Sequence, residues 1–97
     1  MMAKGYWITF YRTISNATAL AEYAKLAGPA IEAGGGKFLA RAVPVEAYEA
    51  GLKERTVLIE FESVGKAIAT YEGANYQAAA KLLWGAVERE VRVIEGV

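Results

Sequence analysis

The chain has 97 residues, of which 55% are hydrophobic and 23% are charged, and its formal net charge is zero. Without an excess of lysine and arginine it offers no surface that would attract nucleic acid. Histidine and cysteine are both absent from the sequence, which excludes ordinary zinc and haem sites and a thiol nucleophile. The acidic residues are not spaced like a calcium loop. We expect one domain over residues 1–97, without metal, cofactor or nucleic-acid partner.

The N-terminal stretch "MMAKGYWITFYRT" has neither the charge pattern of a signal peptide nor the roughly 20 apolar residues of a membrane span. We therefore expect a cytoplasmic protein with no membrane partner.

The first half of the chain is typical of a strand, a helix and a second strand. Residues 5–12, "GYWITFYR", are rich in aromatic and β-branched side chains, which favour strands. Apolar residues recur at helical spacing over residues 15–36. Gly34–Gly36 ends this helix; it is no phosphate loop, because it follows a helix and opens a strand. The second strand is predicted over residues 37–43.

The second half continues with a turn-like segment over residues 44–54. Residues 55–62, "RTVLIEFE", alternate as a strand does. Helices are expected over residues 63–72 and 75–85, with Gly73 between them. The closing stretch "REVRVIEGV" predicts a last strand.

This order is β-α-β-β-α-(α)-β. Two βαβ halves joined by a hairpin predict the α+β class in its ferredoxin-like form, with an extra short helix. Helices would cover one face of a four-stranded antiparallel sheet.

The uncovered sheet face is expected to be apolar. In the third strand, Val57, Ile59 and Phe61 form the row that faces the helices, so Leu58 lies on the other side. The neighbouring strands are expected to add some of three residues to this uncovered face: Trp7, Tyr11 and Leu39. Such a patch on a small protein calls for a partner, and we expect a homodimer packed sheet on sheet.

Four aromatic residues of the helical regions are the first candidates for a binding site: Tyr23, Tyr71, Tyr76 and Trp84. Aromatic side chains at helical spacing mainly indicate core packing. The alternative is that their polar tips line a pocket between the helices and the sheet.

Arg41 and Glu60 are charged residues inside apolar strands, and the alternation places both on the uncovered face. As hairpin neighbours they could form a cross-strand ion pair, line a cavity between subunits, or face solvent. Glu88, Glu90 and Arg92 on the last strand are interpreted as charges that protect a sheet edge.

The sequence also resembles a known family, DUF1330, over nearly its whole length. The resemblance rests on five short stretches in this order: "KGYW" (4–7), "GGKFLAR" (35–41), "ERTVLIEFES" (54–63), "YEGANYQAA" (71–79) and "IEGV" (94–97). It implies the dimeric α+β barrel form of the ferredoxin-like fold. The family's function is unknown, so the resemblance implies no chemistry. Similar folds occur in cofactor-independent antibiotic-biosynthesis monooxygenases, muconolactone isomerase-like enzymes and haem-binding relatives.

The sequence departs from the family pattern at two places. The helix after Tyr76 commonly carries an arginine where this chain has Leu83, and the second strand is commonly followed by "RGG" where this chain has "RAV" at residues 41–43. The first departure predicts a neutral or weakly polar ligand in preference to a phosphate or carboxylate.

Three function classes remain open. The first is a homodimer that binds a small molecule without catalysis. The second is a cofactor-independent oxygenase or isomerase, whose acid–base groups would be tyrosine, glutamate or lysine. The third is a structural or interaction module.

Overall fold

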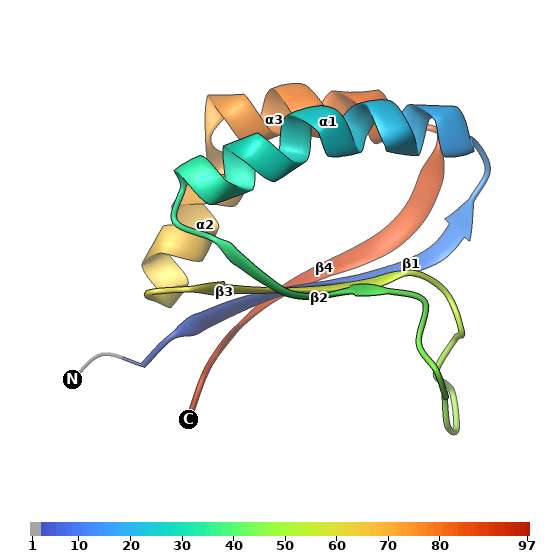
Figure 1. The fold of residues 1–97 in the computed structure, drawn as a ribbon, viewed down its shortest axis with the longest axis horizontal. Coiled ribbons are helices and arrows are strands. Elements are labelled where there is room, and N and C mark those ends of the chain that lie inside the picture. Colours follow the sequence, from blue (N-terminus) through green and yellow to red (C-terminus); the bar gives the residue numbers. More distant parts are fainter. Residues whose placement is uncertain (1–2) are drawn as a thin grey trace.

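The computed structural model describes residues 3–97 and forms a four-stranded antiparallel sheet whose helices cover one face (Figure 1). The strand order is β2-β3-β1-β4. The elements, in chain order, are β1 (Gly5–Ile14), α1 (Ala17–Ala33), β2 (Lys37–Ala42), β3 (Thr56–Phe61), α2 (Val64–Glu72), α3 (Ala74–Ala80), the 3-10 helix η1 (Lys81–Leu83) and β4 (Val87–Glu95). This is the predicted ferredoxin-like α+β fold, extra short helix included.

Side-chain caps and a glycine define the ends of the longer helices. Asn16 accepts a hydrogen bond from the backbone N–H of Ala19 at 3.0 Å, and Ser63 accepts one from that of Lys66 at 3.2 Å. Each bond satisfies a backbone donor that the first helical turn leaves free. Gly35 follows α1 with a φ of +96°, a conformation that favours glycine. The predicted glycine stop after α1 is therefore confirmed.

Trp7 and Tyr11 lie in the core, and their expected place on the uncovered face was wrong. Their exposed fractions are 0% and 3%. In the β1–β3 register Trp7 stands opposite Ile59, so the two residues point to the same, helix-covered side. Both rows of β1 contain aromatic residues, and only strand pairing decides which row is buried.

Arg41 also lies on the helix side of the sheet, contrary to the sequence expectation. The β2–β3 register shifts between Phe38 and Ala40, which leaves Leu39 as an extra residue. Ala40 then stands opposite Leu58, and Arg41 opposite the buried Val57. A bulge of this kind interrupts the simple alternation of faces, because one residue more is present on one strand.

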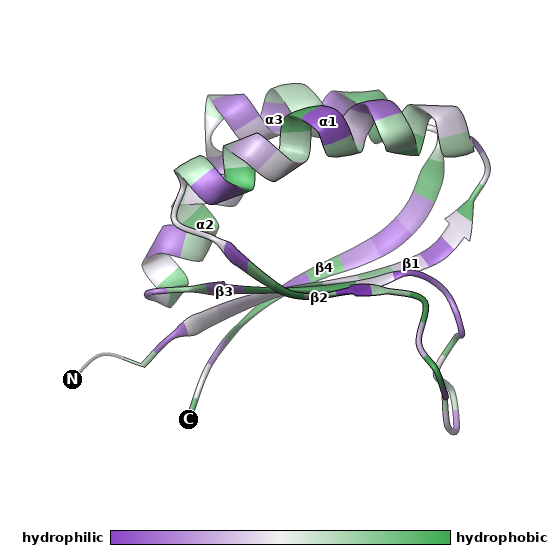
Figure 2. Cartoon of the chain, in the orientation of Figure 1, coloured by the Kyte–Doolittle hydropathy of each residue, from purple (hydrophilic) through white to green (hydrophobic). Residues whose placement is uncertain are grey.

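The uncovered face carries a different set of apolar residues from the expected one. The residues of β1 on this side are Tyr6, Ile8 and Phe10, and Ile8 stands opposite Leu58. Hydrophobic segments continue into the loop between β2 and β3, which hangs below the sheet (Figure 2). This loop exposes four large apolar side chains: Val43, Val45, Tyr48 and Leu52.

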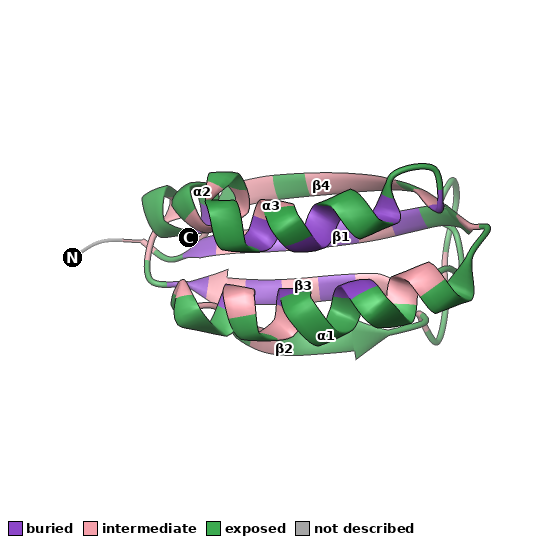
Figure 3. Ribbon diagram, turned by 90° about the horizontal axis from the view of Figure 1, so that it is seen from above, coloured by how far each residue is buried: buried purple, intermediate pink, exposed green. Residues whose placement is uncertain are grey.

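Buried residues gather in the two central strands, while β2 is exposed along most of its length (Figure 3). Within residues 3–97, no helix combines the length and hydropathy that crossing a bilayer requires. The same residues contain no cluster of three or more glutamates that could hold a metal ion.

Candidate functional site

Three tyrosines and one arginine meet between the helices and the sheet. The hydroxyls of Tyr23 on α1 and Tyr76 on α3 are 2.6 Å apart. Arg89 of β4 donates to the Tyr76 hydroxyl at 3.0 Å, to that of Tyr23 at 3.3 Å and to that of Tyr11 at 3.5 Å. We call these four residues the tyrosine–arginine cluster.

Strand pairing and strand alternation bring Arg89 to this position. Arg89 stands opposite Tyr11 in the β1–β4 register, so both side chains lie on the helix side. In β4 this side otherwise carries Val87, Val91 and Val93, all half-buried. Arg89 is thus one cation within a row of valines.

The cluster keeps a positive charge on Arg89 and neutral hydroxyls on Tyr11 and Tyr76 at physiological pH. Burial raises the pKa of Tyr76 far above its ordinary value of 10.0, Tyr23 adds to this, and Arg89 opposes it only in part. Burial lowers the pKa of Arg89, but Tyr76 and Tyr23 raise it by more, so the guanidinium stays charged. No glutamate carboxylate lies within 4.0 Å of the Arg89 guanidinium in the described part of the chain. The cluster can stabilise a developing negative charge, but Tyr76 cannot act as a base.

Arg89 also borders an open groove of about 470 Å³ between the end of α3 and β4. We call it the Arg89 groove. Its other polar and aromatic lining residues are Tyr71, Gln77, Trp84 and Glu88. The Gln77 side-chain amide donates to the Tyr71 carbonyl oxygen at 2.6 Å, which fixes one wall. A volume of this size can hold a small organic molecule.

The four aromatic candidates take different places around Arg89. Tyr23 and Tyr76 are buried behind it, and Tyr71 is half-buried with its ring 5.3 Å from that of Trp7. Trp84 is 73% exposed and lies at the rim of the groove, so it does not border a gap inside the helix–sheet layer as expected. The reason is that α3 and η1 together end at Leu83, earlier than the predicted helix, and the chain then turns toward β4.

Glu60 lies on the uncovered face, as expected, but Arg41 is not its partner. The Tyr6 hydroxyl donates to Glu60 at 3.0 Å and Lys4 lies 3.8 Å away. This hydrogen bond raises the pKa of Tyr6. The β2 residue opposite Glu60 is Lys37, while Arg41 stands opposite Val57 after the bulge, on the other face. The expected Arg41–Glu60 pair is therefore absent.

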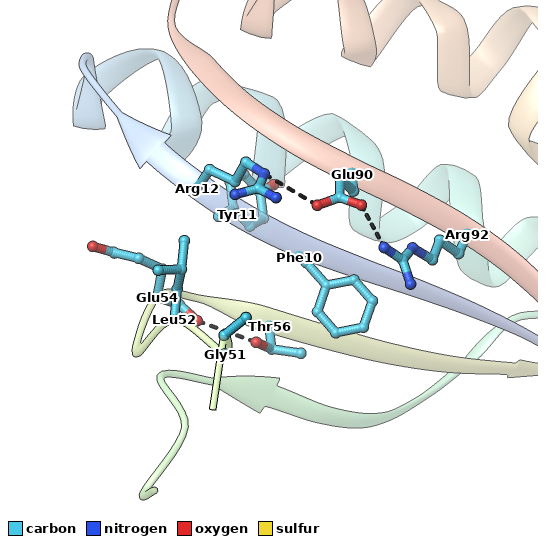
Figure 4. Close-up of a pocket in the computed structure, with 10 residues that line it drawn as sticks. Phe10, Tyr11, Arg12, Gly51, Leu52, Glu54, Thr56, Glu90 and Arg92 are labelled. Carbon is cyan, nitrogen blue, oxygen red and sulfur yellow. Dashed lines mark hydrogen bonds and ion pairs between the residues drawn. The ribbon is translucent and has the colours of Figure 1, made fainter. Parts of the chain in front are cut away.

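A second hollow, of about 290 Å³, lies between the uncovered sheet face and the loop that joins β2 to β3 (Figure 4). The Arg12 Nε is 3.1 Å from the Glu90 carboxylate, which also accepts a hydrogen bond from Arg92. This bond from Arg92 and the charges of both arginines lower the pKa of Glu90. Phe10 and Leu52 line the same hollow. Glu90 and Arg92 of β4 thus take part in ion pairs on the sheet face.

Arg89 is the residue that sequence reasoning missed. It stands among alternating charges in "VEREVRV", which were interpreted as edge-strand charges. The available signal was the period of two, which sets Arg89 in the same row as Val87, Val91 and Val93.

The pH dependence of stability should report the buried Tyr76 hydroxyl. Its raised folded-state pKa means that the unfolded chain loses this proton first, so the stabilisation is complete below about pH 10 and is lost above it. Tyr76→Phe should lower the free energy of unfolding by about 1–3 kcal/mol at neutral pH, since Tyr23 and Arg89 lose a partner. The melting temperature should then fall less steeply between about pH 8 and about pH 11 for the variant than for the wild type.

Tyr48→Phe is the matched control, because Tyr48 is 76% exposed. It should leave the fall of the melting temperature at alkaline pH unchanged. If the melting temperatures of Tyr76→Phe and the wild type fall equally steeply with pH, the raised pKa of Tyr76 is contradicted.

Comparison with known proteins gives a family and a fold. Residues 4–97 match the model of the family described as "Domain of unknown function (DUF1330)". No curated protein matches the chain. The structure is similar to the RPA0582 protein of unknown function from Rhodopseudomonas palustris, with a TM-score of 0.77 and 17% identity over 100% of this chain and 85% of that one.

Other solved structures share the fold at lower identity. A dimeric ferredoxin-like protein of unknown function from Thermobifida fusca has a TM-score of 0.66 and 14% identity, over 99% of this chain and 93% of that chain. A protein from Nitrosomonas europaea, provisionally named an antibiotic biosynthesis monooxygenase, has a TM-score of 0.64 and 14% identity. The match covers 100% of this chain and 93% of that chain. These identities support the fold alone. Because the family match spans residues 4–97, the chain belongs to the DUF1330 family.

Proposed function

We propose that this protein is a homodimer that binds a small, weakly polar molecule in the Arg89 groove, with an acceptor oxygen of the ligand against Arg89. One observation carries the proposal: Arg89 is half-buried and contacts three tyrosine hydroxyls, but none of the glutamates of residues 3–97 neutralises it.

The electrostatics of Arg89 favour an acceptor in the groove. The three hydroxyls occupy only part of the N–H donors of the guanidinium. Removing a charged group from water is costly unless its donors are paired. A carbonyl, enol or phenol oxygen bound from the groove would pair them and would receive a charge-assisted hydrogen bond.

The remaining lining narrows the ligand class. Tyr71 and Trp84 offer aromatic surface on which a flat, apolar body can pack. Glu88 lies on the same lining, and its carboxylate would repel a strongly anionic ligand. Leu83, which stands where the family commonly has an arginine, is buried with 3% of its surface exposed and brings no positive charge to the groove. A neutral or weakly acidic aromatic compound fits these conditions best.

A cofactor-independent oxygenase or isomerase is the second candidate. Arg89 and its tyrosines could stabilise an enolate or phenolate oxygen of a substrate, as the donors of an oxyanion hole do. The raised pKa of Tyr76 removes it as a base, which leaves Glu88 as the base within the groove. The Nitrosomonas europaea protein has a similar fold, which agrees with this candidate function, but a shared fold alone does not establish a shared reaction.

The homodimer part of the proposal rests on the uncovered sheet face. Ile8, Phe10 and Leu58 give it an apolar centre, and the loop between β2 and β3 adds exposed apolar side chains below it. Two such faces can pack on each other as the sheets of a sandwich do. The Thermobifida fusca protein, which has the same fold, is described as dimeric.

Fluorescence titration tests the ligand site directly. Trp84 is exposed at the groove and Trp7 is fully buried, so a ligand in the groove should change mainly the emission of Trp84. We expect a set of phenols and aromatic ketones to include compounds that change this emission. Arg89→Met should weaken their binding about tenfold or more, because a charge-assisted hydrogen bond is lost.

Lys25→Met is the control for loss of a positive charge, since its side chain is 72% exposed on α1. It should bind the compounds as tightly as the wild type does. The affinity of Arg89→Lys should lie between those of the wild type and Arg89→Met. Unchanged binding in a folded Arg89→Met variant would overturn the proposed site. The absence of binding by the wild type would favour the structural-module alternative.

A further inference from the structure

A separate small cavity lies under α1, on the side of the sheet where β2 and β3 pair, and two arginines line it. Its volume is about 30 Å³, and its lining includes Arg41, Arg55, Tyr11 and Tyr23. Neither Arg89 nor Trp84 borders it. The space is large enough for one water molecule or for the carboxylate end of a larger molecule.

Arg55 lines this cavity and also carries an unpaired donor. Its Nε is buried and has no hydrogen-bond partner, and no other buried side-chain nitrogen or oxygen of residues 3–97 lacks one. Buried donors are nearly always paired in folded proteins, so an isolated one indicates a missing partner. Arg55 directly precedes β3 and faces the helix side, as Val57 does two residues later.

Arg41 brings a second positive charge to the same cavity. The β2 bulge turns it to the helix side, and its guanidinium lies 4.4 Å from the centre of the Phe38 ring. Arg41 is an exposed residue, so the cavity reaches the surface at β2. No glutamate carboxylate of residues 3–97 lies within 4.0 Å of either guanidinium. Two cations on one apolar-walled cavity favour an anion between them.

We propose that this cavity binds the carboxylate group of a small organic acid, through Arg55 inside and Arg41 at the mouth. Arginine presents parallel N–H donors that match the two oxygens of a carboxylate. The body of the acid extends outward past Phe38 and along Gly28, where a side-chain carbon would meet nothing within 4 Å. The site is separate from the Arg89 groove, although Tyr11 and Tyr23, which line this cavity, also accept hydrogen bonds from Arg89.

Calorimetric titration with sodium acetate and sodium benzoate, at constant ionic strength, tests the assignment. We expect both acids to bind the wild type. Arg55→Gln should bind them at least about tenfold more weakly. Arg41→Gln should weaken binding as well. The control Lys25→Gln removes an exposed charge of α1 and should bind as the wild type does.

A wild-type crystal soaked with 4-bromobenzoate locates the acid without any variant. Anomalous bromine density at the mouth beside Phe38, with the carboxylate on Arg55, would support the proposal. Sodium chloride that competes with acetate on equal terms would show a site for free small anions and overturn the carboxylate assignment. An ordered water alone on Arg55 Nε in the soaked crystal would overturn the site.

Discussion

Replacing Trp7 by alanine is expected to lower the free energy of unfolding by about 3–5 kcal/mol, the range for deleting a large aromatic side chain from a core. Trp7 is fully buried. Its ring stacks on Phe61 with centroids 6.1 Å apart and meets Tyr76 edge to face at 4.7 Å. Its indole N–H donates to the Thr9 hydroxyl at 2.9 Å. The substitution removes these contacts together and leaves a cavity at the centre of the sheet.

Urea denaturation followed by circular dichroism, at one fixed protein concentration, measures this effect. Leu26→Ala is the control, because Leu26 is 52% exposed on α1. It should change the free energy of unfolding by no more than about 0.5 kcal/mol. A loss below about 1 kcal/mol for Trp7→Ala would mean that the aromatic core is not the main support of the fold.

Replacing Leu58 by aspartate is expected to convert the proposed homodimer into a monomer. Leu58 lies in the middle of the uncovered face, opposite Ile8 on one side and Ala40 on the other. A carboxylate there would have to leave water in an apolar contact, and the twofold symmetry of a dimer would repeat the cost in both subunits. The expected loss of several kcal/mol weakens association about a hundredfold or more.

Light scattering at micromolar concentration measures the mass of each variant. Leu26→Asp is the matched control, since it places the same charge on α1, away from the sheet face, and should leave the dimer intact. A monomeric wild type would contradict the proposed assembly. A Leu58→Asp variant that stays dimeric would show that the subunits associate through another surface.

The sequence predicted the elements and their order because each strand and helix has a clear pattern. The alternation in β3 placed Val57 and Ile59 correctly. It failed in β1, where Tyr6, Ile8 and Phe10 are as apolar as the row of Trp7, so the pattern favours neither face. Strand pairing resolves this choice, and pairing is a long-range property.

The candidate site was harder to predict than the fold. Tyr23 and Tyr76 were found because aromatic residues at helical spacing point inward. Arg41 was set on the wrong face because the bulge at Leu39 has no sequence signal as clear as a glycine. Arg89 was missed because its neighbours in sequence are charged, while its neighbours in space are tyrosines. The unpaired Arg55 depends on atomic packing, which no sequence pattern encodes.

A crystal structure of the protein soaked with phenol and aromatic-ketone fragments tests the proposed function most directly. The result expected is density in the Arg89 groove, with an oxygen of the fragment within hydrogen-bond distance of Arg89 and its ring against Tyr71 or Trp84. Density only on the uncovered sheet face, beside Glu60 or in the hollow next to Glu90, with the Arg89 groove empty, would contradict the proposal and place the binding site between the subunits.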